Sequence, residues 1–235
     1  VDRVLPMLPH KNLIPDINLT PYSIWLATVV VSGISYLSYL LKRYVFHESG
    51  TLVSGIIGGL YSSTATISVL ARKSRKASEQ EATEYVAAML LAVSMMFLRF
   101  MILILIFSRE IFLSIYPYLL IMSVVSAIVG WFVHSRQKLP KDTSVESEED
   151  DSSNPLEFKV ALIFAVLFVV FTVLTHYTLV YAGTSGLNLL SFVSGFSDIT
   201  PFILNLLQNT GSVAVLIITA CSMQAIVSNI LVNMF

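Results

Sequence analysis

One carboxylate, that of Asp198, lies deep within a long apolar stretch of the chain. A carboxylate at the centre of a bilayer costs about 2.5–3.5 kcal/mol on insertion scales, so we interpret Asp198 as a functional group. Pro201 removes a backbone donor and disfavours helix at Thr200, which predicts a broken helix here. Carbonyls freed by such a break, together with hydroxyls and the carboxylate, are suited to coordinating a cation or a polar solute.

A second segment carries a similar pattern without the charge. Residues 50–66, GTLVSGIIGGLYSSTAT, align without a gap with residues 186–202, GLNLLSFVSGFSDITPF, at an offset of 136. The alternative interpretation of both segments is tight helix packing, with hydroxyls bonded back to the helix carbonyls. The aligned positions include Gly59 with Gly195, Ser62 with Asp198, and Thr64 with Thr200.

Further polar residues lie in the neighbouring apolar stretches. Arg99 is a fixed cation within a predicted span, and at an offset of 130 it aligns with Asn229. Arg99 is expected to pair with Asp198 or to contact an anion. The alternatives are that it extends to the lipid headgroups or forms a purely structural pair. Asn205 and Asn229 are candidates for the site or for interhelical hydrogen bonds.

These residues predict a substrate or ion site at mid-membrane, between two repeats. No catalytic constellation is present in the sequence, so we expect no enzyme and no cofactor, and a metal is left open. The predicted site comprises Gly59, Ser62, Ser63, Thr64, Arg99, Asp198, Thr200, Asn205 and Asn229.

The elements that must position this site are membrane helices. The chain is 55% hydrophobic and 12% charged, against about 25% charged in soluble domains. Its net charge of −1 excludes a nucleic-acid binder that works through a basic face. The expected fold is an all-α polytopic membrane protein with about seven transmembrane helices, of which the second and sixth are broken. The predicted spans are 21–41, 50–71, 84–107, 111–134, 158–182, 186–207 and 211–235.

The aligned segments predict a 3+1+3 arrangement. Spans one to three match spans five to seven, with the fourth as connector. The two triplets are parallel if both marked helices cross fully. The predicted organisation is an N-terminal cytoplasmic segment (1–20), the first triplet (21–107), connector helix 4 (108–135), an acidic cytoplasmic linker (136–157) and the second triplet (158–235).

The distribution of Lys and Arg predicts the orientation. With seven crossings, ten cations lie on the side of the N-terminus and three on the other. This places the N-terminus in the cytoplasm and the C-terminus outside, in a multi-pass membrane protein. The chain starts at Val1 rather than Met, and we expect it to be a fragment of a longer protein or a processed form.

Three stretches carry a resemblance to a known family. They are VLPMLP at 4–9, GIIGGLYSSTATISVLARKS at 55–74 and AIVSNILV at 225–232. Together with the helix that holds Arg99, they resemble a bacterial membrane domain of unknown function. That domain is often found C-terminal to an MgtC/SapB-type membrane domain. The resemblance implies a location in the bacterial inner membrane and a fused MgtC-like domain as a partner, and it supplies no activity.

Two functions follow from these features. The first is an integral membrane transporter or channel for an ion or small polar solute. The second is a non-transporting assembly or regulatory module for an attached MgtC-like part. The expected partners are the lipid bilayer, a small ion or polar solute, the fused domain and a second copy of the chain, with no nucleic acid among them.

Overall fold

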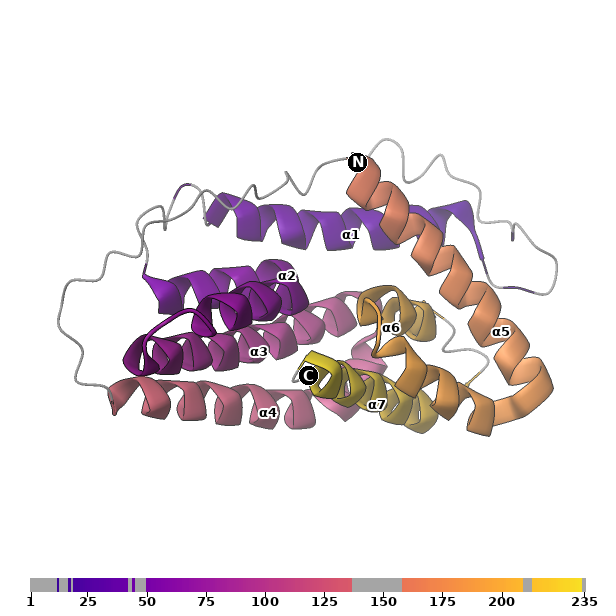
Figure 1. The fold of residues 1–235 in the computed structure, drawn as a ribbon. Helices are drawn as coiled ribbons and strands as arrows, with labels where there is room; N and C mark the ends of the chain where they lie inside the picture. Colours follow the sequence, from indigo (N-terminus) through magenta and orange to yellow (C-terminus); the bar gives the residue numbers. More distant parts are fainter. Residues whose placement is uncertain are drawn as a thin grey trace. The chain divides into compact units, whose positions relative to one another are not determined.

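Among the residues that the computed structural model describes, every element is an α-helix, as the sequence predicts. The structure describes residues 12, 17, 19–41, 44, 50–136, 158–208 and 213–233. Within these ranges, six helices are long and apolar enough to cross a membrane, and α6 is shorter. The helices are α1 (Pro21–Leu40), α2 (Thr51–Ser74), α3 (Glu79–Phe107), α4 (Arg109–Ser135), α5 (Phe158–Ser194), α6 (Ile199–Gln208) and α7 (Val215–Asn233), as drawn in Figure 1.

Contacts within the chain group it into two compact units. The central unit holds α2, most of α3 and most of α4. The C-terminal unit holds α5, α6 and α7. The central unit comprises Gly33–Ile102 and Tyr116–Pro155, and the C-terminal unit comprises Val1–Ser32, Leu103–Ile115 and Leu156–Phe235.

Helix α2 is a hairpin of two arms rather than a straight span. Ser62 has extended backbone angles, φ −157° and ψ 101°, in the middle of the helix. A Cβ added at Gly58 would meet the side chain of Thr66. In a straight helix these two residues would lie about 12 Å apart. The chain therefore reverses at Ser62, and Figure 1 draws α2 as two arms lying one over the other. We call this element hairpin 1.

The packing of hairpin 1 on α3 also shows that the chain reverses, because it gives the direction of each arm relative to α3. A Cβ at Gly55 would lie 2.5 Å from the carbonyl oxygen of Ala88, and one at Gly59 would lie 2.6 Å from the Cα of Ala92. The residue numbers increase in the same direction along both helices, from the pair Gly55 and Ala88 to the pair Gly59 and Ala92. The first arm therefore runs parallel to α3. The second arm enters α3 through a short turn and must run antiparallel to it. Glycine is required at both contacts because the facing atoms are backbone.

Helix α5 is also interrupted. Gly183 has φ 58° and ψ −150°, a region that glycine enters without the steric cost of a Cβ. It separates a long first part, 158–182, from a short arm, 184–194. A turn at 195–198 then leads to the ten residues of α6. The predicted sixth span, 186–207, is therefore not one helix but two short arms.

Those two arms also reverse direction. The Sγ of Cys221 bonds the Oδ1 of Asn188 at 3.4 Å, and a Cβ at Gly195 would meet the side chain of Ser228. The constant difference of 33 residues makes the first arm parallel to α7. It also places Val215, the start of α7, beside residue 182.

A straight continuation of the first arm through α6 is excluded by distance. It would carry Gln208 about 39 Å from the level of residue 182. The seven-residue connection from Gln208 to Val215 spans at most about 25 Å. Helix α6 must therefore turn back toward the start of α7. We call residues 184–208 hairpin 2.

Candidate functional site

Each hairpin begins its second arm with a capped helix N-terminus. The Oγ of Ser62 accepts a hydrogen bond from the backbone N–H of Ala65 at 3.4 Å. The Oδ1 of Asp198 accepts one from the N–H of Thr200 at 2.9 Å. Both bonds satisfy N–H groups that have no partner within the helix. The predicted breaks in the second and sixth segments are confirmed, and their capping residues occupy aligned positions of the sequence.

Pro201 does not break a helix, contrary to the sequence interpretation. Asp198 caps α6, so Pro201 is the third residue of its first turn, and Thr200 is already helical. A proline in the first turn loses no hydrogen bond, because the N–H groups there lack helical partners in any case. Pro201 therefore helps to start α6, and the turn at 195–198 interrupts the chain.

A side chain from the following helix bonds the backbone at each turn. The Nη1 of Arg99 donates to the carbonyl oxygen of Tyr61 at 2.9 Å. The Nδ2 of Asn229 donates to the carbonyl oxygens of Gly195 at 3.1 Å and Ser197 at 3.4 Å. These carbonyls lie where a first arm ends, which is where intrahelical donors are missing. Arg99 and Asn229 therefore fasten the two turns to α3 and α7.

The central unit brings several predicted residues together at the reversal around Ser62, which we call turn 1. Gly59 contacts α3, Ser62 forms the cap and Arg99 holds the adjacent carbonyl. Ser63 is buried and Thr64 is exposed within this unit. The predicted residues of the first segment thus gather around one turn of the chain.

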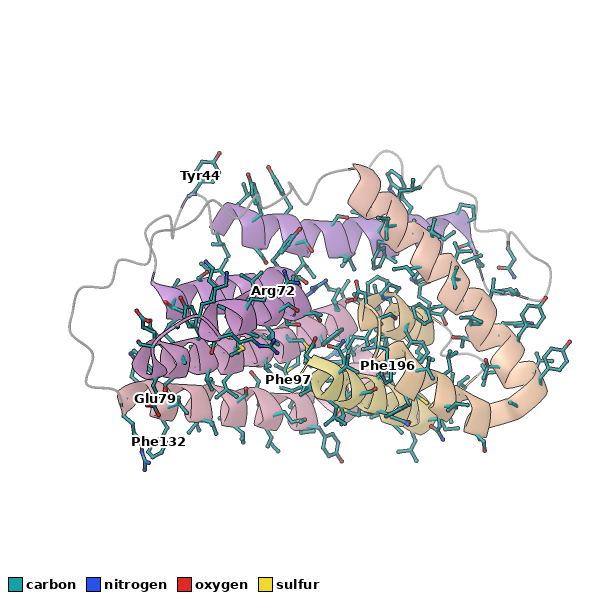
Figure 2. All side chains as sticks on the ribbon, viewed as in Figure 1. Tyr44, Arg72, Glu79, Phe97, Phe132 and Phe196 are labelled. Atoms are coloured by element: carbon teal, nitrogen blue, oxygen red, sulfur yellow. The ribbon has the colours of Figure 1, made fainter. Side chains whose placement is uncertain are left out.

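The C-terminal unit gathers a second set at the turn at 195–198, which we call turn 2. Asp198 and Thr200 form the cap, and Asn229 bonds the backbone beside it. Asp198 is exposed within its unit. So is Phe196, at 64% (Figure 2), which leaves an apolar side chain at the tip of hairpin 2.

Asn205 lies away from turn 2. Its Nδ2 donates to the Oγ1 of Thr172 on α5 at 2.7 Å, and both residues are buried. This bond between α6 and α5 is the interhelical hydrogen bond that the sequence predicted as the alternative role of Asn205. Arg99 belongs to the central unit and Asp198 to the C-terminal unit, so their pairing stays a prediction.

Sequence reasoning missed several buried polar residues of the C-terminal unit. Thr172 is the partner of Asn205, while Thr175 and Ser222 are buried hydroxyls on α5 and α7. The spacing of the two threonines, three residues apart in an apolar helix, was the available signal. Among the described residues, no cluster of His, Cys, Asp or Glu is suited to a metal ion.

Arg99→Gln is expected to destabilise the central unit. Glutamine is shorter and uncharged, so the carbonyl of Tyr61 loses its donor, at a cost of about 1–3 kcal/mol. Thermal unfolding of the purified protein measures the change. Arg109→Gln, an exposed residue at the start of α4, is the matched control and should unfold like the wild type. Equal stability of the two variants would contradict a fastening role for Arg99.

These features define a class, the multi-pass helical membrane protein with discontinuous helices. The chain belongs to the family described as a domain of unknown function, DUF4010, which matches residues 29–235. The match covers both hairpins and the helices that hold them. Neither the curated proteins nor the solved structures give a match. The resemblance seen in the sequence is confirmed for this domain, and an adjoining MgtC/SapB-type domain is not part of the match.

Proposed function

We propose that the protein transports an ion or a small polar solute across the bacterial inner membrane. The observation that carries the proposal is the pair of capped helix breaks at aligned positions of two apolar segments. Non-helical backbone at membrane depth is tolerated where it is buried in protein or lines a water-filled cavity. Transporters place such breaks at their binding sites, because helix ends offer N–H groups and carbonyls to the solute.

The arrangement of each unit supports an internal repeat of helix, hairpin and helix. Gly59 contacts Ala92, and Gly195 contacts Ser228, which lies 136 residues after Ala92. The same offset relates the capping residues, Ser62 and Asp198. It also relates the two carbonyls that are bonded from α3 and α7, those of Tyr61 and Ser197. These contacts share the offset of 136, whereas the donors Arg99 and Asn229 are 130 residues apart, as the sequence alignment of α3 with α7 has them.

The chemistry of the two turns differs. Turn 1 combines a helix N-terminus with the guanidinium of Arg99, which favours a negatively charged group. Turn 2 places the carboxylate of Asp198 beside carbonyls and hydroxyls, which favours a cation or a proton. We therefore propose turn 2 as the cation-binding element and turn 1 as the element that contacts anionic or polar groups.

A membrane assembly module is the second candidate function. The observation in its favour is that the bonds of Arg99 and Asn229 end on backbone carbonyls within their own units. Such bonds stabilise a fold without requiring a solute. In this case the hairpins serve to shape a surface for a neighbouring domain or a second copy of the chain.

A flux screen with the purified protein in liposomes separates the two functions. Tracer monovalent cations, divalent cations, small anions and small polar metabolites are supplied one class at a time. The transport proposal predicts saturable uptake of at least one class above that of protein-free liposomes. Background flux for every class, with protein that remains monodisperse, would favour the assembly module.

A further inference from the structure

The direction of each hairpin fixes how many times the chain crosses the membrane. Hairpin 1 enters and leaves on the same face, because its first arm is parallel to α3 and its second arm leads into α3. Hairpin 2 behaves in the same way with α7. Neither hairpin therefore contributes a crossing. The crossing segments that remain are α1, α3, α4, the first part of α5, and α7.

Three crossings, by α1, α3 and α4, separate the start of α1 from the start of α5. An odd number means that α5 enters from the face opposite to the one that α1 enters. The two helix–hairpin–helix segments are then inverted with respect to the membrane. The parallel arrangement expected from the sequence depended on the condition that the second and sixth predicted helices each cross the membrane fully. Both are hairpins, so that condition is not met.

The charge distribution fits this topology as well as it fits seven crossings. Ten Lys and Arg residues again share one face and three the other. With five crossings, Lys42 and Arg43 are counted on the cation-rich face. The two cations before α1, Arg3 and Lys11, are counted on the other face. By the positive-inside rule, the linker and the C-terminus are cytoplasmic and the N-terminus is outside. The cation-rich set is Lys42, Arg43, Arg72, Lys73, Arg75, Lys76, Arg136, Lys138, Lys141 and Lys159.

We infer that hairpin 1 opens onto the cytoplasmic face and hairpin 2 onto the outer face, each as the gate of that face. The role of the hairpins as gates rests on the proposed transport function. Their orientation in the membrane rests on the packing and on the number of crossings. Inverted repeats of this kind are typical of carriers with alternating access. Arg99 bonds hairpin 1 to α3, and Ser228 and Asn229 bond hairpin 2 to α7. In this proposal hairpin 1 moves when the Arg99 bond is released, and hairpin 2 moves when the bonds of Ser228 and Asn229 are released.

The test is the topology of the full chain in bacterial membranes. Reporters active only inside or only outside the cytoplasm are fused after Phe235 and, separately, within the linker at 144–155. The inverted topology predicts both positions on the same face. A C-terminus on the face opposite to the linker would overturn it. Because no flux is measured, failure of this test is distinct from failure of the transport proposal.

Cysteine labelling in intact cells gives a second readout. A Cys221→Ser background removes the single native thiol. Gly50→Cys lies at the foot of hairpin 1, where an added Cβ meets no atom within 4 Å. It should be protected from an impermeant reagent until the cells are opened. Thr184→Cys, outside in either topology, should label at once and serves as control. Immediate labelling at Gly50→Cys would also overturn the inference.

Discussion

Gly59→Leu is expected to prevent stable folding of the central unit. The added side chain would start 2.6 Å from the Cα and carbonyl oxygen of Ala92. These are backbone atoms, which cannot rotate away, so hairpin 1 and α3 must separate. Overpacking typically costs about 1–3 kcal/mol, and a backbone clash lies at the upper end or above it. The yield of monodisperse protein and its thermal unfolding temperature measure the loss.

Gly33→Leu is the matched control for this substitution. It adds the same side chain to a membrane helix at a position where a Cβ meets no atom within 4 Å. It should unfold close to the wild type. Gly195→Leu, which would clash with α7 at the aligned position, should behave like Gly59→Leu. Wild-type stability of Gly59→Leu would contradict the close packing of hairpin 1 on α3.

Asp198→Asn is expected to abolish flux of the transported solute while the protein stays folded. Asparagine caps helices about as well as aspartate, so the bond to Thr200 is retained and only the charge is removed. If turn 2 binds a cation or carries a proton, transport should collapse to the level of empty liposomes. The measurement is tracer uptake, with unfolding temperature and size-exclusion profile recorded on the same preparation.

A double variant separates a binding role of Asp198 from a pairing role. If Asp198 only neutralises Arg99, Asp198→Asn should destabilise the protein by roughly 3–5 kcal/mol, because a buried cation loses its partner. Adding Arg99→Gln should then recover most of that loss and leave only the smaller loss that Arg99→Gln causes by itself, because the carbonyl of Tyr61 still lacks its donor. A double variant that has the stability of Arg99→Gln alone and no flux supports the site, provided that Arg99→Gln alone retains flux. One that is stable and fully active contradicts it.

The positions of the breaks could be predicted from the sequence, because glycine, serine and aspartate interrupt otherwise apolar segments. The direction of the chain after each break could not. Hydropathy does not distinguish a straight segment of 24 residues, the length of α2, from two arms of half that length. The informative signal was the spacing of Gly55 and Gly59, which matches that of Ala88 and Ala92 and permits close parallel packing.

The local roles of Pro201 and Asn205 show a second limit of the sequence. A proline starts a helix or breaks one depending on where the N-cap lies, and the cap at Asp198 is visible only in the structure. Asn205 is a candidate for the site by its sequence position, yet its partner, Thr172, lies 33 residues away. Contacts of that kind depend on how helices pack, which periodicity within one helix does not determine.

The reversal of α2 is the claim on which both the site and the topology depend, and one distance measures it. Spin labels at Gly50→Cys and Arg75→Cys, in the Cys221→Ser background, mark the two feet of hairpin 1. Labels at Glu79→Cys and Ile102→Cys on the unbroken α3 provide the reference, at about 35 Å. The structure predicts that the two feet lie within about 10 Å of each other, plus the reach of the labels. A separation near 38 Å, that of a straight helix, would contradict the hairpin and the inverted topology with it.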